Sequence, residues 1–240
     1  MSPVSTPIVR RVDRPRLHSW AAIVAGLVVF AGFAPSFYLK GMFGAPDLSP
    51  LLLLHGVVMT LWFVLFMVQV RLVAAGRTDL HRRVGVFGAV LFTLLVVVAL
   101  TTAIDAGRRG ASPAPGVPAL AFMAIPFTDI AVFGVLVGTA LWVRRRSDTH
   151  KRLMLLATLS ILTPAIARIP LDFIRQAGLP MFFGLTVLAV IVCVVVDSVK
   201  NRRLHPAFGW GGALVVASLP LRVMMAGTKT WTQFATWLVA

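Results

Sequence analysis

The stretch "TDLHRRVGVFGAVLFTLLVVVAL", residues 78–100, decides the fold class of this chain. A histidine and two arginines stand directly before a long apolar run, which is close to the ~20 residues that a helix needs to cross a bilayer. The whole chain shares this character, since 58% of its 240 residues are hydrophobic, 13% are charged and the mean hydropathy is +0.90. These values lie outside the range of soluble globular domains. The sequence therefore predicts an all-α integral membrane protein.

Apolar runs of similar length recur along the chain and predict a bundle of about seven transmembrane helices. They lie at residues 20–38, 51–73, 84–104, 119–143, 153–169, 180–199 and 209–226. The runs at 153–169 and 209–226 are short and each has an arginine near its outer end, so the pattern also allows five or six spans. We expect one helical membrane domain at 20–226, between a basic tail at 1–19 and an interfacial segment at 227–240.

The formal net charge of +15 indicates membrane topology rather than nucleic-acid binding, because the cations fall in patches between apolar runs. Cytoplasmic loops of membrane proteins are rich in lysine and arginine. Most of these residues precede the first span or follow the second, fourth and sixth spans, which predicts a cytoplasmic amino terminus and an external carboxyl terminus. They are Arg10, Arg11, Arg14, Arg16, Arg71, Arg77, Arg82, Arg83, Arg144, Arg145, Arg146, Lys151, Arg152, Lys200, Arg202 and Arg203.

The first span and the single cysteine limit the chemistry further. A basic amino terminus before an apolar stretch also resembles a secretory signal, but "AGFA" at 31–34 is a poor cleavage site, so we favour an uncleaved first span. Cys193 lies in the middle of the sixth predicted span. One cysteine excludes an internal disulfide, a Cys-x-x-Cys site and covalent c-type haem attachment.

The basic stretch that opens the third predicted span is repeated. Residues 77–83, "RTDLHRR", align with residues 146–152, "RSDTHKR", and each segment closes a basic loop and opens an outward-running helix. A third copy begins at His205, because glycines follow both His81 and His205 at offsets of four and seven. The sequence therefore predicts that two-helix units are duplicated along the chain.

Two interpretations of the repeated histidines remain open. In the first, His81, His150 and His205 are interfacial polar residues, while Asp79 and Asp148 cap the helices that they open. In the second, the three histidines lie at one depth and converge on a metal ion or a haem b, with aspartates as further ligands or as partners of the histidines. Those aspartates are Asp79, Asp148 and Asp197. The chain has no glutamate, which excludes the usual di-iron carboxylate site.

A second polar group lies in the outer half of the predicted membrane. It consists of His55, Asp129, Arg168 and Arg222, which a helical rise of about 1.5 Å per residue places within about 15 Å of the outer surface. An aspartate in hydrocarbon costs about 2.5–3.5 kcal/mol, so we expect Asp129 to face the bundle interior and to pair with Arg168 or Arg222. Such a group is either a ligand or proton site, or a structural ion pair.

We expect two further polar segments to lie at the membrane interface without a role in a functional site. Asp197 ends the sixth predicted span, where it balances Arg202 or Arg203. In the carboxyl-terminal segment "TKTWTQFATWLVA", residues 228–240, a cap at Thr230 would start a short amphipathic helix that anchors the chain in the outer interface. Its apolar face would consist of Trp231, Phe234, Trp237 and Leu238.

Six segments, in order along nearly the whole chain, resemble a family of uncharacterised bacterial multi-span inner-membrane proteins. They are "FAPSFYLKGMFGAPDLS", "LHG", "DLHRRVGVFGAVL", "PFTDI", "THKRLMLLATLSILTPAIARIP" and "RRLHPAFGWGGALVVASLPLR". The resemblance implies a bacterial cytoplasmic membrane location and no particular reaction. It also implies recurrent polar positions, which are His55, His81, Asp129, His150, Arg168, Asp197, His205 and Arg222. The segment "HKRLM" is similar to a helix start in small membrane proteins linked to haem–copper oxidase assembly.

Three classes of function fit these observations. The first is a protein that binds or passes a small ligand or a proton, with Asp129 as proton acceptor or ion partner, Arg168 and Arg222 as anion clamps, and His55 titrating. The second is a haem- or metal-binding redox or oxidase-associated protein that uses the repeated histidines. The third is a non-catalytic scaffold or assembly subunit whose helix faces bind other membrane proteins or a second copy. No serine or cysteine lies in a nucleophile-elbow motif, which argues against a hydrolase.

Overall fold

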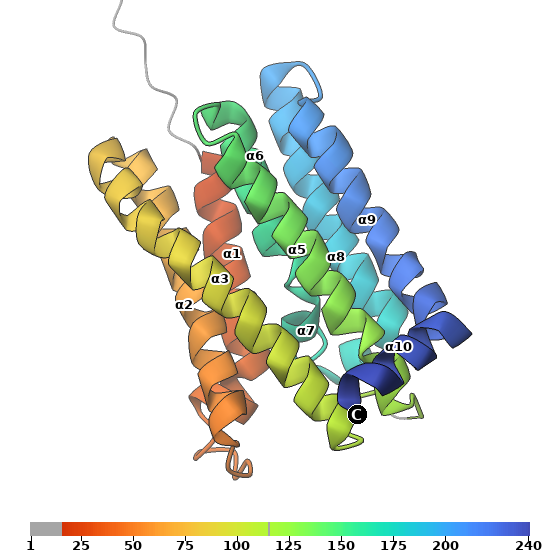
Figure 1. Ribbon diagram of the computed structural model, residues 1–240. Helices are drawn as coiled ribbons and strands as arrows, with labels where there is room; N and C mark the ends of the chain where they lie inside the picture. Colours follow the sequence, from red (N-terminus) through yellow and green to blue (C-terminus); the bar gives the residue numbers. More distant parts are fainter. Residues whose placement is uncertain (1–15, 115) are drawn as a thin grey trace, which may run out of the picture.

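The computed structural model describes residues 16–114 and 116–240, and every regular element in these residues is helical (Figure 1). Six helical segments are long and apolar enough to cross a membrane. They are α1 (Arg16–Phe33) with the π-helical turn η1 (Ala34–Tyr38), α2 (Pro50–Ala74), α3 (Thr78–Arg108), α4 (Ala119–Phe122) with α5 (Ala124–Trp142), α8 (Asp172–Asn201) and α9 (Pro206–Ala226). The predicted all-helical, membrane-type fold is confirmed, with six such segments in the described residues rather than seven. Residues 1–15, with most of the predicted basic tail, lie outside the described residues.

The apolar run at 153–169 does not form one long helix. It lies in α6 (Ser147–Ser160), a short break and the single turn α7 (Thr163–Ile166). Pro164 explains the break, because proline has no N–H and its ring clashes with the carbonyl four residues earlier, which belongs to the last residue of α6. A short helix suffices here because α6 packs against α1, α5, α8 and α9. Its leucines are therefore covered by other helices.

Three helix connections gather at one end of the bundle, which we call the basic end and define by the turns at 75–77, 143–146 and 202–205 (top of Figure 1). The loops at 39–49 and 109–118 lie at the opposite end. The predicted caps at the basic end are wrong. Arg77 and Arg146 occupy the N-cap positions without a side-chain cap bond, while Asp79 and Asp148 are the second residues of their helices and lie in the first turn. Acidic residues in the first turn still interact favourably with the positive end of a helix.

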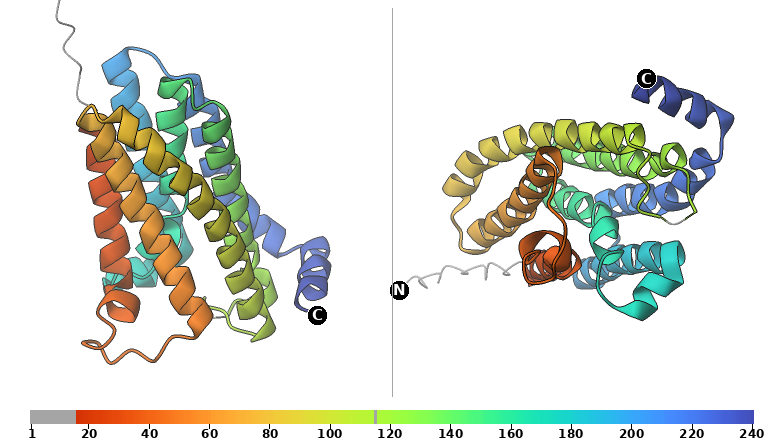
Figure 2. Two further views of the ribbon diagram at one scale, coloured as in Figure 1. Left: turned by 60° about the vertical axis from the view of Figure 1, so that its left-hand side comes forward. Right: turned by 90° about the horizontal axis from the view of Figure 1, so that it is seen from below.

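The carboxyl-terminal segment forms α10 (Lys229–Val239), which lies beside the ends of α3 and α4 at the opposite end of the bundle (Figure 2). Its cap is Thr228 rather than the predicted Thr230, and the Thr228 side chain accepts a hydrogen bond from the backbone N–H of Trp231. The buried indole of Trp231 donates from Nε1 to the carbonyl of Leu120 at 2.8 Å. Trp237 on the same helix is 71% exposed. One face of α10 is thus fixed to the bundle and another is free to meet the membrane interface.

Candidate functional site

Asp129 of α5 and Arg222 of α9 form a buried ion pair in the half of the bundle away from the basic end. We call it the opposite-half pair. Arg222 donates from Nη1 to Asp129 Oδ1, and the two residues are only 1% and 5% exposed, respectively. The other guanidinium nitrogens of Arg222 bond within α9, from Nε to the backbone carbonyl of Ser218 at 3.2 Å and from Nη2 to Ser218 Oγ at 3.0 Å. The ring of Phe183 lies 5.6 Å from the guanidinium carbon. Arg222 therefore meets Asp129 through one of its three nitrogens.

His55 and Arg168 lie apart from this pair. Arg168 donates from Nη1 to the carbonyl of Pro164 at 2.9 Å, and its guanidinium carbon lies 5.2 Å from the ring centre of Phe33. Its charge acts on His55, whose Nδ1 is buried and makes no hydrogen bond to any described residue. Because α7 packs against α1 and α8, it directs Arg168 toward α1. The four residues expected at one depth thus form two groups rather than one.

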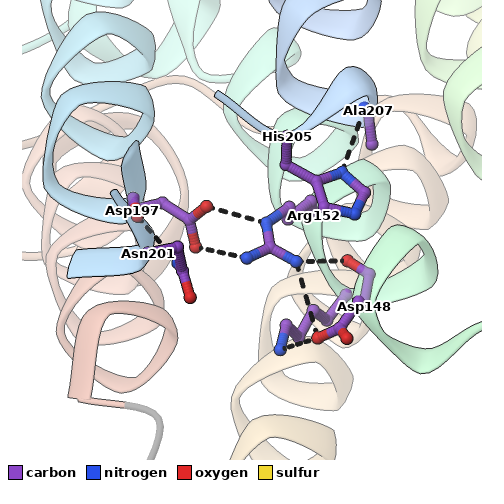
Figure 3. Close-up of polar contacts among 7 residues, drawn as sticks. Asp148, Arg152, Asp197, Asn201, His205 and Ala207 are labelled. Carbon is purple, nitrogen blue, oxygen red and sulfur yellow. Dashed lines mark hydrogen bonds and ion pairs between the residues drawn. The ribbon is translucent and has the colours of Figure 1, made fainter. Parts of the chain in front are cut away.

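A second buried ion pair lies at the basic end, between Arg152 of α6 and Asp197 of α8; we call it the basic-end pair. Arg152 donates from Nε to Asp197 Oδ2 at 2.8 Å and from Nη2 to Asp197 Oδ1 at 2.9 Å (Figure 3). Its third nitrogen, Nη1, donates to the backbone carbonyl of Asp148 at 2.8 Å. The expected pairing of Asp197 with Arg202 or Arg203 is wrong. Asp197 points into the bundle toward α6, whereas both of those arginines are exposed beyond the end of α8.

Polar groups from four helices surround the basic-end pair. A cavity of about 50 Å³ beside it is lined by Asp148, Arg152, Asn201, Arg203 and His205. Lys151 donates to the carboxylate of Asp148 at 2.5 Å. Burial, together with the charge of Arg152, lowers the pKa of His205. From α1, His18 adds a buried ring whose Nε2 has no hydrogen-bond partner among the described residues.

The three repeated histidines do not converge. His81 and His150 approach each other, with ring centres 6.4 Å apart and ring planes at 77°. His205 belongs to the surroundings of the basic-end pair, where its Nδ1 accepts a hydrogen bond from the backbone N–H of Ala207 and caps α9. Within residues 16–114 and 116–240, no three histidine, cysteine or acidic side chains form a group that could hold a metal ion. The proposed triad is thus replaced by a pair of histidines.

Asp79 also lies outside any such group. Its carboxylate is exposed, and the ion pair that it forms within the described residues is with Arg77 of its own loop, at 3.8 Å. Asp148 contacts Lys151 and Arg152, and Asp197 contacts Arg152, so neither acid approaches the two neighbouring histidines through a hydrogen bond or an ion pair in the part of the chain that the structure describes.

Several residues of these groups were not expected from the sequence. Arg152 was interpreted as a topological charge, although it is 4% exposed. Ser218 was not singled out, because a serine in a membrane helix usually bonds only its own backbone. Gln69 was also missed, and it is the one amide side chain in the apolar run at 51–73. For Gln69, the signal was an amide side chain inside an apolar run.

Comparison of the chain with family models, with curated proteins and with solved structures gives no match. The family resemblance described from sequence segments therefore remains an expectation.

Proposed function

We propose that this chain is a seven-pass bacterial inner-membrane protein that binds or passes a proton or a small ligand at the opposite-half pair. In this arrangement α6 and α7 together make the fifth crossing, since residues 147–166 are about as long as a membrane span. The basic end faces the cytoplasm, as the positive-inside rule requires. Exposed tryptophans near that end, Trp20, Trp142 and Trp210, fit a membrane boundary there.

The bonding of Arg222 is the observation on which the proposed function depends. A carboxylate inside a membrane is costly, and such residues are functional candidates by default. Asp129 offsets that cost with a single oxygen-to-guanidinium bond, while Arg222 keeps two further bonds to Ser218 of its own helix. If Asp129 takes up a proton, Arg222 therefore does not lose all its acceptors. The pair can open and close at a small cost to the fold.

Close packing favours a proton over a larger ligand. Arg222 is 1% exposed and the ring of Phe183 lies over its guanidinium group, so the pair leaves little room for a bulky molecule. The His55 and Arg168 group provides a second polar position, and Arg168 is exposed there. We assign it the role of an entry position at the external side of the membrane.

Proton flux into liposomes tests this function. The purified protein is reconstituted with an internal pH-sensitive dye, and a potassium gradient with valinomycin sets an inside-negative potential. We expect wild-type protein and the matched control Asp47→Asn, which alters an exposed loop pair with Lys40, to acidify the lumen. Asp129→Asn should reduce the flux to that of empty liposomes. Equal flux in Asp129→Asn and wild type, or no flux in wild type, would contradict the proposal.

A further inference from the structure

Two buried acceptors near the basic end lack donors. They are Nδ1 of His81 on α3 and Oε1 of Gln69 on α2, and neither makes a hydrogen bond to any described residue. The amide of Gln69 lies against Gly85, where its Nε2 would be 3.5 Å from an added Cβ. Positions 81 and 85 share one face of α3, one helical turn apart. The Gln69 backbone also lies close to the ring of His81, so the two residues are neighbours.

A third acceptor comes from α6. His150 Nδ1 lies 2.9 Å from the backbone carbonyl of Ala140, which can only accept, so Nδ1 carries the proton and Nε2 keeps a free lone pair. No described residue donates a hydrogen bond to that Nε2. A carbonyl that orients a histidine through its other nitrogen is the usual arrangement of metal-binding histidines. The neighbouring ring is that of His81, at 6.4 Å between centres.

A positively charged occupant would satisfy all three acceptors at once. A buried acceptor without a donor costs about 1–3 kcal/mol. Two of the three acceptors, Nδ1 of His81 and Oε1 of Gln69, are buried without a partner among the described residues. Imidazole nitrogens bind zinc and copper ions well and bind magnesium and calcium poorly. With Zn–N bonds of about 2.0–2.1 Å, one ion between the two rings can reach a nitrogen of each.

We propose that His81 and His150, with the amide oxygen of Gln69, bind one divalent transition-metal ion of the zinc class at the basic end. His205 takes no part. Its Nδ1 accepts a hydrogen bond from the backbone N–H of Ala207, so in the neutral ring Nε2 carries the proton and has no free lone pair. Three protein ligands leave one position of a tetrahedral ion open to water or to a further ligand. The site is independent of the opposite-half pair, whose residues lie on α5 and α9.

Zinc binding to the purified, chelator-treated protein tests this site. Equilibrium dialysis with metal analysis should give one zinc ion per chain. We expect His81→Ala and His150→Ala each to weaken binding at least 100-fold, and Gln69→Ala about 10-fold. His205→Asn is the matched control, because asparagine also caps helices and the change should leave zinc affinity unaltered.

A second measurement guards against variants that fail to fold. Cobalt(II) added to the wild-type protein should give the visible absorption of a low-symmetry, nitrogen-ligated ion, and zinc should displace it. No stoichiometric zinc in the wild type, no cobalt spectrum, or an equal loss of binding in His205→Asn and His81→Ala would overturn the proposal. The first of these outcomes would indicate that water occupies the position.

Discussion

The two buried arginine–aspartate pairs have the same composition and divide their hydrogen bonds in opposite ways. In the basic-end pair, two of the three nitrogens of Arg152 bond the carboxylate of Asp197 on another helix. In the opposite-half pair, one nitrogen of Arg222 bonds Asp129 and the other two bond Ser218 on the same helix. The first arginine therefore depends on its aspartate for most of its bonds, whereas the second does not.

This difference indicates which of the two ion pairs can open. Removing one partner of a buried ion pair leaves an uncompensated charge, and the cost depends on what else can accept its hydrogen bonds. Arg152 would be left with the carbonyl and carboxylate of Asp148. Arg222 would keep both bonds to Ser218. We therefore expect the basic-end pair to hold α6 and α8 together, and the opposite-half pair to be able to open and take up a proton.

Breaking the basic-end pair should have the largest effect. Asp197→Asn leaves the buried guanidinium of Arg152 without a counter-charge at the bonded position, which should lower the free energy of unfolding by about 3–5 kcal/mol. Unfolding in mixed detergent micelles, followed by far-ultraviolet circular dichroism, measures this change. The control is Asp47→Asn, whose exposed pair should contribute less than about 1 kcal/mol. A stability of Asp197→Asn equal to that of the wild type would remove the distinction between the two pairs.

A double-mutant cycle sharpens the account of the opposite-half pair. Asp129→Asn should cost only about 1–2 kcal/mol, since the asparagine oxygen still accepts one bond and Ser218 holds the rest of Arg222. Ser218→Ala should cost about 1 kcal/mol. The double variant should lose more than the sum of the two, because each change removes the support that makes the other tolerable. The same unfolding assay applies, and strictly additive losses would show that Ser218 does not back up Asp129.

The smallest expected effect concerns His205, whose neutral Nδ1 caps α9 beside the basic-end pair. Burial, together with the charges of Arg152 and Arg203, lowers the pKa of His205 in the folded state, against weaker opposition from Asp148 and Asp197. The unfolded chain therefore takes up its proton first, and stability falls as the pH drops below about 6.5 toward the lower folded value. His205→Asn should lack this pH-dependent component. The free energy of unfolding of both proteins is measured as a function of pH. Equal pH dependence in the variant and the wild type would contradict this prediction.

Much of the fold could be predicted because a membrane span needs only length and apolar composition. The helices that face lipid, such as α2 and α3, satisfy that requirement and were found in the sequence. The run at 153–169 does not form one long helix, because Pro164 ends α6. A short helix suffices there because other helices surround α6. Apolar composition cannot tell a lipid-facing segment from one that is buried among helices.

The sequence predicted that Asp129 pairs with an arginine, but not where each candidate residue lies around the bundle. Counting residues along a helix placed Asp129, Arg168 and Arg222 at similar depth, and the helical rise is regular enough for that. Which side of the bundle each one faces depends on how the helices pack, and so Arg168 lies beside α1 instead. The same limit explains Asp197, for which the nearest arginines in sequence were chosen although Arg152 is its partner in space.

The central claim is that Asp129 is the carboxyl group that takes up a proton inside the membrane. The most direct test is a pH-induced infrared difference spectrum of the protein in lipid, which detects the carbonyl stretch of a protonated carboxylic acid. We predict such a band in the wild type and in Asp47→Asn, and its loss in a folded Asp129→Asn protein. A band that persists in Asp129→Asn, or is missing from the wild type, would contradict the account.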